Sequence, residues 1–123
     1  MGWTIVIGLF LIAHGLVHVA MYAPPAASDA PFDPAGSWLF RRRLRPLALT
    51  LATITAVILV VAGIGLLAHQ EWWQAATVVG ASASLVVLVL FFHPWLSLGV
   101  AINVAMIWLL AQTEWPTTDM LDW

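Results

Sequence analysis

Four long apolar stretches dominate this chain of 123 residues. They cover residues 3–22, 46–68, 73–92 and 95–112. Each is close to the length of about 20 apolar residues that an α-helix needs to cross a hydrocarbon core about 30 Å thick. Because lipid cannot hydrogen-bond a bare backbone, such stretches are expected to be helical. The sequence therefore predicts an all-α integral membrane protein, with four transmembrane helices in an up-down bundle.

The composition indicates that little of the chain lies in water. Hydrophobic residues make up 63% and charged residues 8%, whereas soluble domains average roughly 45–50% and about 25%. The remainder is a loop at 23–45, short connections and a tail at 113–123. We therefore expect a single transmembrane domain over residues 1–123. The first stretch lacks the positive n-region of a signal peptide, so we expect it to remain as the first helix.

All four basic residues precede the second span: Arg41, Arg42, Arg43 and Arg45. Positive residues beside a helix end mark the cytoplasmic side of a cell membrane. This cluster predicts a cytoplasmic first loop and two extracytoplasmic termini. Tryptophan favours the membrane interface, and the predicted boundaries carry Trp3, Trp72, Trp73 and Trp115 on the outer side and Trp38 and Trp95 on the inner side.

The first loop has surface chemistry of its own. Prolines prevent a long helix there, but Asp33-Pro34 has the pattern of a helix start, with an N-cap and a proline at the first helical position. We expect a short helix that carries Trp38 toward the arginines. Two interpretations of those arginines stay open: a site for lipid headgroups, at about 1 kcal/mol per basic residue, or a topology signal alone.

Residues 61–72 and 104–115 share Val, Ala, Ile, Leu-Leu, Ala and Glu-Trp at matching positions. Such an echo indicates two helical hairpins related by an axis along the membrane normal, an arrangement found in transporters with parallel repeats. Apolar helices use few residue types, so a chance match is the alternative.

Two histidines, His14 and His18, lie inside the first span. A spacing of four places both on one helix face, and ionisable side chains at membrane depth are costly and usually functional. We expect His14 to face the bundle or a subunit contact and not lipid, near Asn103 or the layer of Thr53 and Ser84. The other spans carry a candidate polar midplane layer of Thr53, Thr55, Ser82, Ser84 and Asn103, whose members are expected to face one another because lipid offers them no partner.

Three interpretations of the histidine pair remain open. Neutral imidazoles could hydrogen-bond across helices and fix the bundle. Alternatively, His14 and His18 could bind haem or a divalent metal, with His93 as a further ligand, although the spans contain no Asp or Glu to complete a metal site. The third is a path for protons or a solute along the stripe.

The rest of the sequence narrows the classes of function. The chain lacks cysteine and carries a net charge of −2, which excludes thiolate sites and argues against nucleic-acid binding. No Ser-His-Asp order, paired carboxylates or phosphate loop favours an enzyme. We expect an accessory subunit of a larger membrane complex, or a homo-oligomer, in the lipid bilayer. The alternative is a small transporter or ligand-binding protein with its site at the histidines.

Overall fold

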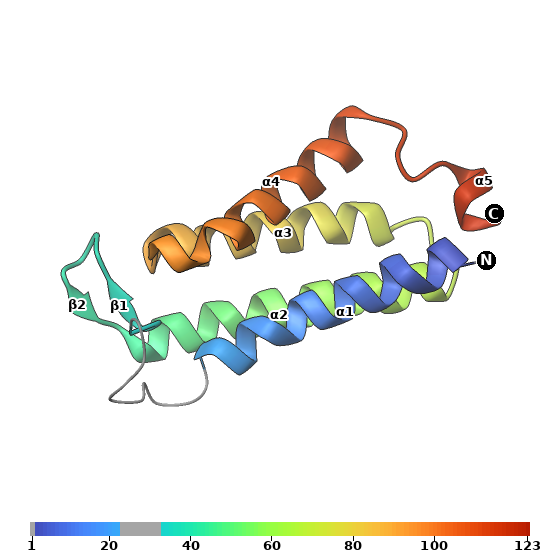
Figure 1. Ribbon diagram of the computed structural model, residues 1–123. Coiled ribbons are helices and arrows are strands. Elements are labelled where there is room, and N and C mark those ends of the chain that lie inside the picture. The colour runs from blue at the N-terminus through green and yellow to red at the C-terminus, as the bar shows by residue number, and fades with distance from the viewer. Residues whose placement is uncertain (1, 23–32) are drawn as a thin grey trace.

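The computed structural model describes residues 2–22 and 33–123 and is built almost entirely of helices (Figure 1). Four of the described helices are long and apolar enough to cross a membrane, counting η1 and α4 as one span. The predicted all-α four-helix membrane fold is therefore confirmed. In chain order the elements are α1 (Gly2–Tyr22), β1 (Gly36–Ser37), β2 (Arg42–Arg43), α2 (Arg45–Leu67), α3 (Trp73–Leu90), η1 (Pro94–Leu96), α4 (Ser97–Gln112) and α5 (Thr118–Leu121).

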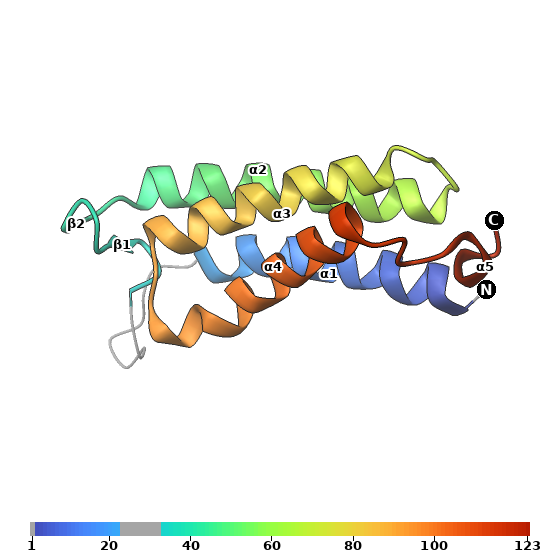
Figure 2. The ribbon, with the colours of Figure 1, turned by 90° about the horizontal axis from the view of Figure 1, so that it is seen from above.

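The four long helices run up and down, so both termini lie at one end of the bundle, called here the terminal end (Figure 1). The opposite end, called the loop end, carries the β-strands and η1. Helix α1 packs along α2, α2 along α3, and α3 along α4. Helix α4 leans away from α1 toward the terminal end, and the two views agree on this oblique path (Figures 1 and 2). The bundle is thus closed on three sides and loosely packed between α1 and α4.

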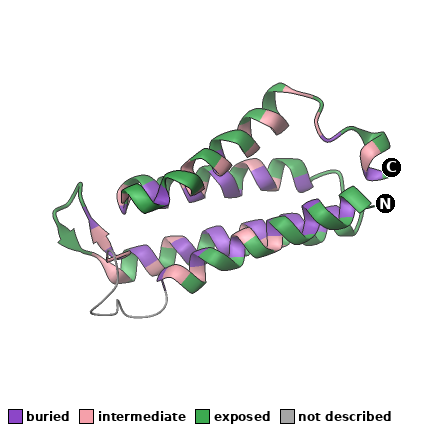
Figure 3. Ribbon diagram, viewed as in Figure 1, coloured by how far each residue is buried: buried purple, intermediate pink, exposed green. Residues whose placement is uncertain are grey.

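The two segments that echo each other in sequence differ in packing. Ala62 of α2 is buried, whereas the equivalent Ala105 of α4 is exposed. Leu66 is buried and its equivalent Leu109 is half-buried. Among the described residues of α4, Asn103 alone is buried, and most of this helix is open to its surroundings (Figure 3).

Glycines bring α1 and α2 into close contact. A Cβ atom added to Gly63 would lie 2.7 Å from the backbone oxygen of Gly8, and one added to Gly15 would lie 3.0 Å from the backbone oxygen of Ala56. Small residues allow helix backbones this approach in lipid, where van der Waals packing replaces the hydrophobic drive. The α1–α2 pair is therefore the most closely packed part of the bundle.

The first loop departs from the short helix expected at Asp33. Residues 23–32 lie outside the described part of the chain, and β1 and β2 form an antiparallel hairpin with Ser37 opposite Arg42. The carboxylate of Asp33 accepts a hydrogen bond from the backbone N–H of Ala35, and its carbonyl accepts one from Gly36. Asp33 therefore stabilises a turn, a local alternative that Asp side chains offer in place of a helix cap.

The C-terminal tail returns to the terminal end of α1. The Thr4 hydroxyl donates to the carbonyl of Leu121 at 2.7 Å, and the Leu121 side chain is buried beside Trp73. The ring of Trp123 stacks on that of His69, with 5.4 Å between centroids. Trp73, at the start of α3, is 1% exposed, because the tail and α1 cover it.

Candidate functional site

His14 and Asn103 join α1 to α4 at mid-depth. The Nε2 atom of His14 lies 3.1 Å from Oδ1 of Asn103, the neighbour that the sequence analysis expected. Since an amide oxygen only accepts, His14 must donate through Nε2. The amide nitrogen of Asn103 donates in turn to Oγ of Ser84, at 2.7 Å. Asn103 is 0% exposed, so it is fixed between α1 and α3 by both ends of its side chain.

His18 completes a closed set of hydrogen bonds, called here the histidine network (His14, His18, Ser84 and Asn103). Its Nδ1 lies 2.9 Å from the backbone oxygen of His14 and must donate to it. Its Nε2, 2.6 Å from Oγ of Ser84, then accepts the hydroxyl proton of Ser84. The side chains of His18, Ser84 and Asn103 each give and receive one bond, whereas His14 donates through Nε2 and accepts through its backbone carbonyl. With one donating and one accepting ring nitrogen, His18 is a neutral imidazole.

The histidine network connects α1, α3 and α4. Part of the predicted polar midplane layer lies outside it. Thr53 and Ser82 face outward and donate to carbonyls of their own helices, those of Leu49 and Val78. Thr55 is buried, but its hydroxyl has no hydrogen-bond partner among the described residues. A hydroxyl that bonds four residues back is satisfied without a neighbouring helix, so depth alone does not determine where Thr53 and Ser82 point.

The geometry gives no support to the metal site considered from the sequence. His93 lies at the start of η1, where its Nδ1 accepts from the backbone N–H of Trp95. Within residues 2–22 and 33–123, no group of three histidine, aspartate or glutamate side chains is placed to hold a metal ion. Both ring nitrogens of His18 and Nε2 of His14 are already engaged. The pair also cannot clasp a haem, because both residues lie on one face of α1.

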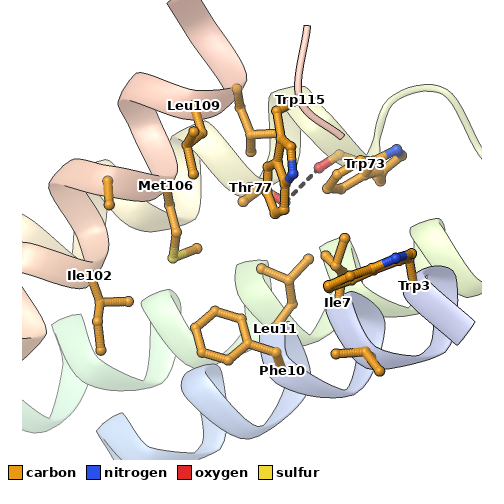
Figure 4. A pocket seen from close by; sticks show the side chains of 13 residues that line it. Trp3, Ile7, Phe10, Leu11, Trp73, Thr77, Ile102, Met106, Leu109 and Trp115 are labelled. Carbon is orange, nitrogen blue, oxygen red and sulfur yellow. Dashed lines mark hydrogen bonds between the residues drawn. The ribbon is translucent and has the colours of Figure 1, made fainter. Parts of the chain in front are cut away.

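An apolar pocket of about 350 Å³ lies between α1 and α4, on the terminal side of the His14–Asn103 contact. Its side chains converge from four segments, with Phe10 on α1 opposite Ile102 and Met106 on α4 (Figure 4). Thr77, the hydroxyl-bearing residue of the lining, donates to the carbonyl of Trp73 at 2.8 Å. The full lining is Trp3, Val6, Ile7, Phe10, Leu11, Trp73, Thr77, Ile102, Ala105, Met106, Leu109, Leu110 and Trp115.

No family model, curated protein or solved structure matches this chain. Its function must therefore follow from its own geometry. A cavity of this size falls in the range of roughly 300–1,000 Å³ that is usual for small-molecule sites. The lining residues present an apolar surface to the pocket, which suits a hydrocarbon.

A second pocket, of about 310 Å³, lies on the loop side of the same contact and is called the histidine pocket. His14, His18 and Tyr22 contribute to its wall from α1, and Ile102 lines both pockets. The rings of Phe10 and His14 stack, with 5.6 Å between centroids, at the boundary between the two. Two pockets therefore lie between α1 and α4. One is lined by apolar side chains and the other partly by imidazoles, and the His14–Asn103 hydrogen bond separates them.

The apolar pocket was not predicted from the sequence. Its signal is weak: Trp3 and Phe10 are seven residues apart, which places both on one face of α1, but this face was interpreted only through its histidines. The other aromatic contributors, Trp73 and Trp115, fall at predicted span ends, where tryptophan is ordinary. Their convergence depends on the tilt of α4 and the path of the tail.

Proposed function

We propose that the protein binds the hydrocarbon part of a lipid or other lipophilic molecule in the apolar pocket. The observation that carries this proposal is a pocket with an apolar lining inside the membrane-spanning region, bounded by α1 and α4. Trp3, Val6 and Phe10 are exposed on its α1 side. In a bilayer these side chains face lipid, so a chain can enter sideways without crossing water.

The chemistry of the lining favours a hydrocarbon chain. Aromatic and aliphatic side chains from α1, α3, α4 and the tail form most of it. The hydroxyl of Thr77 is already bonded to the carbonyl of Trp73, so a polar ligand would lose its hydrogen bonds to water there without replacement.

The histidine network has a structural role in this proposal. The His14–Asn103 contact fixes the distance between α1 and α4 at one edge of the apolar pocket. Ser84 holds Asn103 from α3, so α4 is held in place although little of it is buried. We propose that the histidine network sets the width of the pocket. The histidines then position helices and take no part in chemistry.

Filling the pocket should remove the ligand. Ala105 lines it, whereas Ala101, one turn away on α4, is exposed and outside the lining. Purified Ala105→Phe is expected to retain at least about tenfold less co-purifying lipid than the wild-type protein, a loss of about 1.4 kcal/mol. Mass spectrometry of organic extracts measures the retention. Equal lipid retention in wild type and Ala105→Phe would contradict the proposal.

A role as a subunit or homo-oligomer is the second candidate, and the outward face of α4 favours it. Trp108 is 57% exposed there, although tryptophan prefers the membrane interface to a position inside a span. Ala101 lies seven residues away on the same face. Ala101→Phe therefore also tests this candidate: a loss of particle mass in mild detergent, with lipid retained, would favour assembly through α4.

We further propose that the loop end is cytoplasmic and the terminal end extracytoplasmic, from the arginine cluster. The chain has no cysteine, so a single introduced one is a unique label. Asp29→Cys and Thr117→Cys should react with a membrane-impermeant thiol reagent from opposite sides of oriented vesicles. Labelling of both from one side would show that the number of crossings or their direction is wrong.

A further inference from the structure

The hairpin of β1 and β2 presents an exposed apolar tip at the loop end. It extends across the direction of the long helices (Figure 1), and so along the membrane surface when those helices span the bilayer. Its tip is residues 38–41, between the two strands. Trp38, Leu39 and Phe40 are 58%, 51% and 50% exposed. Three consecutive large apolar side chains therefore project at the level where the spans leave the hydrocarbon.

The base of the hairpin is fixed to the bundle. Ser37 donates through its hydroxyl to the carbonyl of Leu90 at 2.7 Å, and the indole N–H of Trp38 donates to the carbonyl of Val89 at 2.6 Å. These carbonyls belong to the last turn of α3, where helix geometry leaves acceptors without intrahelical donors. Ala35 is buried against Phe91. The tip is thus held outward by a fixed base.

The arginines around this tip differ in their surroundings. Arg43 forms an ion pair with Asp33, with 2.8 Å between Nε and Oδ2, which joins β2 to the turn before β1. Arg45 is the half-buried first residue of α2. Arg41 and Arg42 are exposed next to the apolar tip, and Arg41 has a positive φ of 54°, which places it at the bend into β2.

We propose that this hairpin tip binds anionic lipid headgroups. Trp38, Leu39 and Phe40 enter the boundary between headgroups and acyl chains, and the guanidinium groups of Arg41 and Arg42 bind lipid phosphate. Aromatic and aliphatic side chains beside basic ones are the usual composition of segments that lie in the membrane interface, and arginine forms paired, charge-assisted bonds to phosphate. The proposal is independent of the apolar pocket. It divides the four arginines into two lipid contacts, the ion pair of Arg43 with Asp33, and Arg45 at the start of α2.

The test compares the wild-type protein with Arg41→Gln/Arg42→Gln, which keeps Arg43 and Arg45 to preserve orientation. Native mass spectrometry measures retained phosphatidylglycerol and phosphatidylcholine. The double variant is expected to bind phosphatidylglycerol roughly thirtyfold more weakly, from the usual contribution of two basic residues. Arg41→Lys/Arg42→Lys should keep most of the binding, and inorganic phosphate should not displace the lipid. Unchanged phosphatidylglycerol retention in the glutamine variant, or its displacement by phosphate, would overturn the proposal.

A second measurement locates the tip. A nitroxide at Leu39→Cys, the single cysteine in the chain, should be accessible to oxygen and shielded from a water-soluble relaxation agent in vesicles containing phosphatidylglycerol. The shielding should decrease in phosphatidylcholine alone and in the glutamine double variant. A label that is equally water-accessible in all three would contradict insertion. Labelling of Thr117→Cys in the same vesicles verifies that orientation is unchanged.

Discussion

Replacing Gly63 with valine is expected to cause a large loss of stability, by separating α1 from α2. A Cβ atom at Gly63 would lie 2.7 Å from the backbone oxygen of Gly8 and 2.7 Å from Cγ1 of Ile12. A backbone oxygen cannot move aside as a side-chain end can, so the helices must part. Overpacking typically costs about 1–3 kcal/mol, and we expect about 3 kcal/mol here. The free energy of unfolding, from a denaturing-detergent titration followed by circular dichroism, measures it.

Gly99→Val is the matched control for this prediction. The nearest atom to a Cβ at Gly99 is the Cδ1 end of Leu88, at 3.2 Å, and a leucine methyl can shift by a few tenths of an ångström. We expect its cost to be below about 1 kcal/mol, as for a mild change of packing. Equal unfolding midpoints for the two variants would show that the α1–α2 approach is less close than the glycine contacts indicate.

The sequence predicted the helices because lipid imposes one solution on a long apolar stretch. Predicted and observed ends agree within a few residues: α2 begins at Arg45, and α3 ends at Leu90. The hairpin could not be predicted in this way. Asp33-Pro34 matches a helix start, but the bonds of Ser37 and Trp38 to the end of α3 are tertiary, and tertiary context overrides local propensity.

The candidate site was predictable where depth and chemistry coincide. His14 and Asn103 lie at equal depth on different helices, and each needs a partner in lipid, so their contact follows. Thr53 lies at a similar depth but bonds its own helix. The apolar pocket was not predictable, because apolar side chains surround α4 except at a few positions such as Asn103, and its sequence does not set its tilt. In the structure, α4 is held at Asn103 by His14 and Ser84, and the tail beyond it packs Leu121 against the core.

The strength of the His14–Asn103 contact is the second large effect that we expect. Asn103→Leu removes the acceptor of His14 and the donor to Ser84. It leaves Nε2 of the half-buried His14 without its acceptor and the buried hydroxyl of Ser84 with His18 as its remaining partner. Such losses typically cost about 1–3 kcal/mol. A double-mutant cycle of His14→Leu with Asn103→Leu should give a coupling free energy of about 0.6–1.7 kcal/mol, the range found between membrane helices. Detergent unfolding of the four proteins provides all the terms.

The variant His14→Gln distinguishes a structural role of the histidine network from a chemical one. Glutamine can still donate to Oδ1 of Asn103, so a positioning role predicts that this variant keeps most of the stability and the lipid retention, whereas His14→Leu loses both together. Haem, metal or proton chemistry predicts another result, because an amide neither ligates like imidazole nor titrates near neutral pH. Loss of lipid retention in a fully stable His14→Gln variant would therefore assign a role to the imidazole itself. It would contradict a purely structural role of the histidine network. A coupling free energy near zero would remove the His14–Asn103 contact as the element that holds α4 beside the apolar pocket.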